Sequence, residues 1–71
     1  MAKIIDPLKA YREANGLTQQ AIAKKLRVSR GLVSLLETGG KKYTADMAVH
    51  IEETLGIPRS KFRPDLFERA A

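Results

Sequence analysis

A break of only three residues constrains the fold of this chain more than any other feature. Residues 27–29, Arg-Val-Ser, separate two short segments, 19–26 and 30–38, in which apolar side chains recur at helical spacing. Thr18 and Ser29 stand directly before these segments, where a side-chain oxygen caps the first turn of a helix. Because so short a connection makes two helices cross steeply, the sequence predicts a helix-turn-helix.

Helix signals flank this unit on both sides, and no strand pattern occurs. Asp6 and Pro7 favour the start of a helix over residues 8–15, because aspartate is a good N-cap and proline fits the first helical position. Two more helices are expected at 45–55 and at 58–62, the first of them ended by a glycine.

This pattern predicts an all-α fold, a compact bundle of about five short helices whose second and third helices form the helix-turn-helix. With 71 residues, the chain has room for one domain and one modest core. We expect the domain core to cover residues 6–63, with Pro64 ending the fifth helix. The tail, 64–71, contains Leu66 and Phe67 and is a candidate for dimerisation.

The composition argues against several classes of function. The chain has no cysteine, which removes disulfides, thiolate catalysis and zinc ribbons and fits a reducing compartment. No apolar run is long enough to span a bilayer, and residues 1–5 do not resemble a secretory signal, so we expect a cytoplasmic, nucleoid-associated protein. His50 is the only histidine, so neither a metal nor a cofactor is expected. The sequence shows no nucleophile–base constellation and no phosphate-cradling glycine loop, so we expect no enzyme activity.

The charge balance favours a polyanionic partner. Thirteen lysine and arginine residues against eight acids give a net charge of +5 and an isoelectric point near 9.9. Neutralising phosphates releases counterions and drives binding to nucleic acid. Charge alone is equally compatible with a merely soluble basic domain, so the expectation of DNA binding depends mainly on the helix-turn-helix.

A helical projection divides the segment 30–38 into two faces. Leu32, Val33 and Leu36 cluster on the inward side, and Leu35 lies at the edge. The outward side is small, polar and basic, and it comprises Arg30, Gly31, Ser34 and Thr38. Such a face suits insertion into the major groove better than it suits a merely solvated surface, which usually carries more glutamate and lysine.

Several motifs in this region resemble the lambda-repressor and Cro family of helix-turn-helix proteins, found in phage and bacterial regulators. The motifs are LTQ at 17–19, AIAKKL at 21–26, VS at 28–29, and SLLE at 34–37 followed by Thr-Gly. The ending GIPRSKFRPDLF, 56–67, is similar to a branch of small Cro-like or antitoxin-like regulators. The resemblance covers nearly the whole chain, and it implies the lambda-repressor-like fold and a role in binding DNA.

Two residues depart from the family pattern. Arg27 occupies a turn position where members usually have glycine and where φ is often positive, so we expect either a cost of about 1 kcal/mol or a relaxed turn. Leu35 stands where the family often carries lysine, arginine or glutamine for a phosphate or base contact. It leaves an apolar alternative, contact with a thymine methyl group.

The resemblance also implies roles for individual side chains. Gln19 corresponds to a family position that hydrogen-bonds a phosphate. Arg30, by its residue type and its place on the outward face, is the best candidate for bidentate recognition of guanine, with a phosphate contact as the alternative. Arg12 and Glu37 are expected to form a partly buried ion pair between the first and third helices. The other expected DNA contacts are Ser29, Gly31, Ser34, Leu35, Thr38, Lys41 and Lys42.

Together these features predict a Cro-like repressor that binds a palindromic operator in double-stranded DNA as a homodimer, since one unit recognises only a few base pairs. Candidate dimer residues are Ile57, Phe62, Leu66 and Phe67. For Ile57 and Phe62 the alternative is that they close the core. A second hypothesis is an antitoxin-like autoregulator whose tail also binds a partner protein, although the tail after Pro64 is short for a large partner surface.

Overall fold

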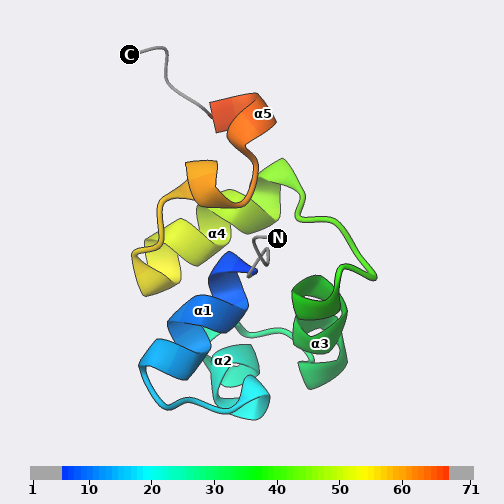
Figure 1. The fold of residues 1–71 in the computed structure, drawn as a ribbon, viewed down its shortest axis with the longest axis vertical. Coiled ribbons are helices and arrows are strands. Elements are labelled where there is room, and N and C mark those ends of the chain that lie inside the picture. Colours follow the sequence, from blue (N-terminus) through cyan, green and yellow to red (C-terminus); the bar gives the residue numbers. More distant parts are fainter. Residues whose placement is uncertain (1–5, 68–71) are drawn as a thin grey trace, which may run out of the picture. The chain divides into compact units, whose positions relative to one another are not determined.

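The computed structural model describes residues 6–67, and every regular element in this range is a helix (Figure 1). The all-α class predicted from the sequence, with five α-helices, is therefore confirmed. The chain divides into two compact units, residues 1–41 and residues 42–71. No helix within residues 6–67 has the length and apolar character needed to cross a membrane.

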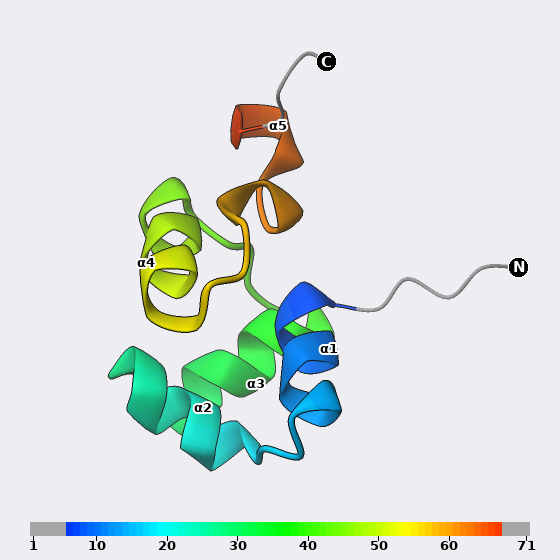
Figure 2. The same cartoon turned by 90° about the vertical axis from the view of Figure 1, so that its left-hand side faces the viewer.

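The first unit holds three helices, α1 (Pro7–Ala14), α2 (Gln19–Leu26) and α3 (Arg30–Thr38). Asp6, Thr18 and Ser29 precede them, and the side chain of each accepts hydrogen bonds of 2.9–3.1 Å from backbone amides of the turn that follows. The three helix starts therefore lie where the capping residues predicted them. Helices α2 and α3 pack against each other across a short turn (Figure 2).

The turn between α2 and α3 is closed by a residue in the left-handed conformation. Arg27 has φ 61° and ψ 43°, and among the described residues it is the only non-glycine residue with positive φ. The amide of Val28 donates a hydrogen bond of 3.0 Å to the carbonyl of Ala23, which reverses the chain at the end of α2. Of the two outcomes expected for Arg27, the structure shows the left-handed turn, and the arginine bears its conformational cost.

Apolar side chains from all three helices of this unit are buried. They are Leu8, Ile22, Ala23, Leu26, Val33 and Leu36. Both α3 residues come from the face expected to point inward. Burial of this face determines which side of α3 is left in solvent.

The second unit holds α4 (Ala45–Leu55), a 3₁₀ turn η1 (Arg59–Lys61) and α5 (Pro64–Phe67). Thr44 caps α4 by accepting a hydrogen bond of 3.1 Å from the amide of Met47. Gly56 ends α4 with a φ of 81°. The buried apolar residues of this unit are Tyr43, Ala48, Ile51, Ile57 and Phe62, and the rings of Tyr43 and Phe62 pack with centroids 4.7 Å apart.

The fifth helix predicted over 58–62 is wrong. Only Arg59–Lys61 forms a helical turn there, of the 3₁₀ type, and Pro64 begins α5 instead of ending a helix. The missing N–H and fixed φ of proline stop a preceding helix, but they also suit the first position of a new one. Of the predicted tail, residues 64–67 therefore form a helix, whereas 68–71 lie outside the described residues.

Candidate nucleic-acid interface

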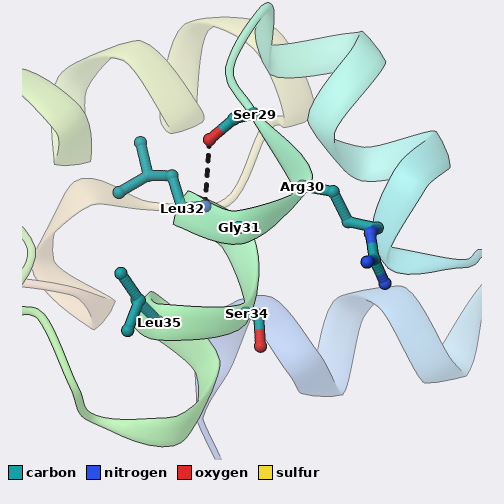
Figure 3. Close-up of a pocket in the computed structure, with 6 residues that line it drawn as sticks. All are labelled: Ser29, Arg30, Gly31, Leu32, Ser34 and Leu35. Carbon is teal, nitrogen blue, oxygen red and sulfur yellow. Dashed lines mark hydrogen bonds between the residues drawn. The ribbon is translucent and has the colours of Figure 1, made fainter.

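The solvent-facing side of α3 forms a shallow, open hollow. Six residues line it, namely Ser29, Arg30, Gly31, Leu32, Ser34 and Leu35 (Figure 3). Arg30 and Gly31 are exposed and Ser34 is half-buried. On the opposite side of the helix, Val33 and Leu36 are buried. The projection made from the sequence therefore assigns these residues of α3 correctly, but it is wrong for Leu32, which it placed inward and which is half-buried and lines the hollow.

Two hydroxyl groups at the ends of α3 differ in what they offer to a phosphate. Ser29 Oγ accepts a hydrogen bond of 3.1 Å from the amide of Leu32, which leaves its own hydrogen for donation. Thr38 Oγ1 instead donates its hydrogen to the carbonyl of Ser34 at 2.9 Å. Because a phosphate oxygen only accepts hydrogen bonds, Thr38 must give up this internal bond to contact one. Ser29 is therefore the better phosphate ligand of the two.

Arg30 also borders a second hollow, at the start of α2. The other residues around it are Arg12, Gly16, Leu17, Thr18, Gln19 and Gln20. In Figure 3 the side chain of Arg30 extends away from Leu32 and Leu35. The first N–H groups of a helix lack intrahelical partners and carry positive partial charge, so an arginine beside them produces a place suited to an anion. Both roles considered for Arg30, guanine recognition and phosphate contact, are compatible with this position.

One carboxylate joins the three helices of this unit. The side chain of Glu37, near the end of α3, is only 2% exposed, and it accepts hydrogen bonds from Arg12 Nε at 2.9 Å and Arg12 Nη2 at 3.0 Å. Arg12 Nη1 also donates to the carbonyl of Leu17 at 3.2 Å. The hydrogen bond to Glu37 raises the pKa of Arg12 above its ordinary value, so the guanidinium stays charged.

Gln19 takes part in the same network, which the sequence did not indicate. Its Nε2 donates a hydrogen bond of 3.2 Å to Glu37 Oε1, across 18 positions of the chain. No local pattern predicts a contact between positions so far apart. The only hint of this contact in the sequence is that Gln19 is the first residue of α2, a helix that lies between α1 and α3 in the chain. Gln19 therefore has a structural role in addition to the phosphate contact expected for it.

A comparison with known protein families matches residues 8–62 to the helix-turn-helix family. The chain belongs to the lambda-repressor and Cro type of helix-turn-helix proteins. This assignment agrees with the capped helices α2 and α3, the left-handed turn between them, and the exposed face of α3 that carries Arg30 and Ser34. No curated protein and no solved structure matches the chain significantly. Since this family consists of DNA-binding regulators, the protein is a DNA-binding transcription regulator.

Two further cations of this helix-turn-helix protein follow α3 in the chain. Lys41 and Lys42 are both exposed. The backbone amide of Lys41 donates a hydrogen bond of 3.2 Å to the carbonyl of Leu35, so the chain at this point is tied to the last turns of α3. The backbone of Lys41 is thus held next to the end of α3, while its side chain is exposed to solvent.

The four residues proposed for a dimer contact separate into two groups. Ile57 and Phe62 are only 8% and 7% exposed, so they close the core and do not offer a surface to a partner. For both residues the burial agrees with the alternative expected from the sequence, that they close the core, and Phe62 lies directly after the 3₁₀ turn. Leu66 is 52% exposed, and Phe67 is half-buried with Arg59 Cζ 5.5 Å from its ring centroid. Of the four candidates, only the two on α5 present apolar surface.

Proposed function

We propose that this protein is a Cro-like repressor that binds a palindromic operator as a homodimer, with α3 in the major groove. The observation that carries the proposal is the exposed face of α3 with Arg30 and Ser34, opposite the buried Val33 and Leu36. The major groove admits an α-helix and presents a distinct chemical pattern for each base pair. Two copies on adjacent half-sites provide the affinity and the specificity that one unit lacks.

In this proposal, the first turns of α3 contact the bases. Arg30 donates to O6 and N7 of a guanine, a contact worth about 1–3 kcal/mol of discrimination. Gly31 has no side chain and is exposed, so the helix backbone approaches the groove closely there. Ser34 lies one turn beyond Arg30 in the same hollow and offers a hydroxyl to a neighbouring base edge.

Contacts to the DNA backbone position the helix and come from the residues around it. Gln19 Nε2 carries two hydrogens, and since Glu37 accepts one of them, the other is available to a phosphate oxygen. The hydroxyl of Ser29 and the ammonium groups of Lys41 and Lys42 are further donors, with Thr38 a weaker one for the reason given above. Such contacts carry little sequence information but determine the register of the protein on the duplex.

The homodimer contact is proposed at α5. Leu66 and Phe67 are neighbouring apolar residues, and Leu66 is more than half exposed. Exposed apolar surface of this kind marks interfaces. A partner protein bound to α5, as in an antitoxin-like autoregulator, would use the same surface. Sedimentation of the pure protein with a duplex that it binds distinguishes these cases, because a complex with one copy per duplex would refute the homodimer.

Selection of bound sequences from random duplexes, with the wild type and with Arg30→Ala, tests this function. The wild type should enrich two similar half-sites, arranged as a palindrome, about 34 Å apart. Arg30→Ala should lose its preference at one base pair of each half-site and keep the others. Uniformly weaker binding with all preferences intact would assign Arg30 to a phosphate, and a wild type that enriches no sequence would refute the proposal.

A further inference from the structure

We infer that Leu35 recognises the C5-methyl group of a pyrimidine in the operator, and that Gly40 leaves free the space in which the Leu35 side chain lies for this contact. The inference rests on the proposed insertion of α3 into the major groove. The C5-methyl group belongs to thymine or to 5-methylcytosine, and both present it at the same place in the groove.

Leu35 is unusual in being a large apolar side chain left in solvent. It is 48% exposed, and in the first unit it is the only large hydrophobic residue that the structure describes as exposed. It lies four positions, about one helical turn, after Gly31. A side chain at Gly31 would meet only Ser29 Oγ, at 4.0 Å, so the surface next to Leu35 is open. A base edge that approaches Gly31 therefore also reaches Leu35.

The chain after α3 folds back against Leu35. The amides of Gly40 and Lys41 both donate to the carbonyl of Leu35, at 2.8 Å and 3.2 Å. A β-carbon built at Gly40 would lie only 2.9 Å from Leu35 Cδ2, a distance that real β-carbons essentially never show. The Leu35 side chain thus occupies space that any residue other than glycine at position 40 would take. The φ of Gly40 is not in the positive range, so what a glycine provides at this position is space for Leu35 and not an unusual backbone conformation.

The chemistry of the hollow limits what Leu35 contacts. The side chain of leucine neither donates nor accepts hydrogen bonds, so it cannot pair with the polar groups of a base edge. Where it shields such a group from water, the lost hydrogen bond to water weakens binding. A pyrimidine methyl group is the apolar feature that the major groove offers. The half-buried Leu32 lies on the same side of the hollow, whereas Arg30 extends to the other side (Figure 3). The apolar side of α3 is thus separate from its guanidinium group.

The test uses the duplex that the wild-type protein enriches, with each thymine replaced in turn by deoxyuridine, which removes only the methyl group. At one thymine per half-site the wild type should bind about fourfold more weakly, the size expected for one methyl group left in water. Leu35→Ala should bind thymine and uracil equally at that position. Glu53→Ala, which shortens an exposed side chain of α4 that takes part in neither the proposed DNA contact nor the proposed dimer contact, should keep the wild-type ratio.

Two further experiments test whether 5-methylcytosine can replace thymine and whether Gly40 contributes to the contact. With a C·G pair at the sensitive position, methylation of the cytosine should strengthen wild-type binding by about the same fourfold factor, since the methyl group is the same. Gly40→Ala should reduce the thymine-to-uracil ratio while the melting temperature changes little, because only the flexible end of Leu35 must move.

Two outcomes overturn the inference. One is a wild type for which no thymine is sensitive to loss of its methyl group, and the other is a Leu35→Ala variant that keeps the wild-type ratio. A wild type that enriches no duplex at all is a different result, since it refutes operator binding itself and the inference falls with it.

Discussion

The two units of this protein differ most clearly in how they use charge. Residues 1–41 contain eight basic and three acidic residues, whereas residues 42–71 contain five of each. The net charge of +5 therefore resides entirely in the unit that contains the helix-turn-helix. This asymmetry supports phosphate binding by the first unit and leaves the second unit electrically neutral.

The ion pairs of the described residues follow the same division. In the first unit, Arg12 and Glu37 lie 25 positions apart, and their contact joins two helices. In the second unit, Arg59 pairs with Glu52 and Arg63 pairs with Asp65. The partners in each pair are close in sequence, and their side chains are partly or well exposed. The first unit thus uses a buried pair to fix the orientation of its helices. The second unit pairs two of its arginines with carboxylates nearby in sequence and presents the apolar Leu66.

Removal of one carboxylate in each unit should give the largest contrast. Glu37→Ala leaves the Arg12 guanidinium without its buried partner, so the free energy of unfolding should fall by about 3–5 kcal/mol. Glu52→Ala removes an exposed pair and should change stability far less. Urea denaturation followed by circular dichroism measures both. Equal losses for the two variants would show that burial does not distinguish these pairs.

The two exposed leucines, one in each unit, should separate DNA binding from dimerisation. Leu66→Glu places a charge in the proposed dimer contact, so the dissociation constant of the dimer should rise by about tenfold or more while helix content is retained. Leu35→Glu should leave dimerisation unchanged and weaken DNA binding. Sedimentation equilibrium and a duplex-binding titration on both variants give the result. Dimer loss in Leu35→Glu with none in Leu66→Glu would reverse the assignment of the two surfaces.

Backbone substitutions at two helix ends should act in opposite directions. Arg27→Gly relieves the left-handed turn of the first unit and should stabilise the protein by about 1 kcal/mol. Gly56→Ala introduces the same kind of strain after α4, where φ is 81°, and should destabilise by about 1 kcal/mol. Thermal unfolding of both variants compares them directly. A destabilised Arg27→Gly would mean that the arginine side chain contributes contacts worth more than the strain.

The smallest expected effect is a pH dependence that arises in the second unit. The hydrogen bond from Arg59 lowers the pKa of Glu52, against a smaller opposing effect of burial. Because the folded-state pKa is the lower one, this contribution to stability is complete above the unfolded-state pKa and is lost as pH falls through the folded-state value. The stability difference between wild type and Glu52→Gln should therefore shrink between about pH 7 and about pH 3. A difference that grows in acid would contradict the direction of the pKa shift.

Much of the fold follows from local signals in the sequence. Thr18, Ser29 and Thr44 each cap a helix that begins at the next residue, and capping depends only on neighbours within one turn. The helical period likewise predicts the buried Val33 and Leu36 and the exposed Arg30 of α3, although it places Leu32 too far inward. These elements were predictable because the physical interactions that form them are short-range.

The remaining features depend on interactions that no short pattern encodes. The 3₁₀ turn at Arg59–Lys61 was predicted as a helix because a proline signals both the end of one helix and the start of the next. Phe62 is buried by ring packing with Tyr43, nineteen positions away, as the tertiary structure requires. The hydrogen bond from Gln19 to Glu37 likewise requires the crossing of α2 and α3 to be in place. Long-range contacts of this kind determine the details of the candidate site.

The most direct test of α3 as the DNA-binding surface is a nitrogen-15 amide titration of the full chain with the duplex that it enriches. The largest shift changes should fall on residues 29–35 and on the first turn of α2, with smaller changes at Lys41. Changes concentrated on residues 59–67, with α3 unaffected, would show that the protein contacts DNA through its second unit and would contradict the assignment of the interface.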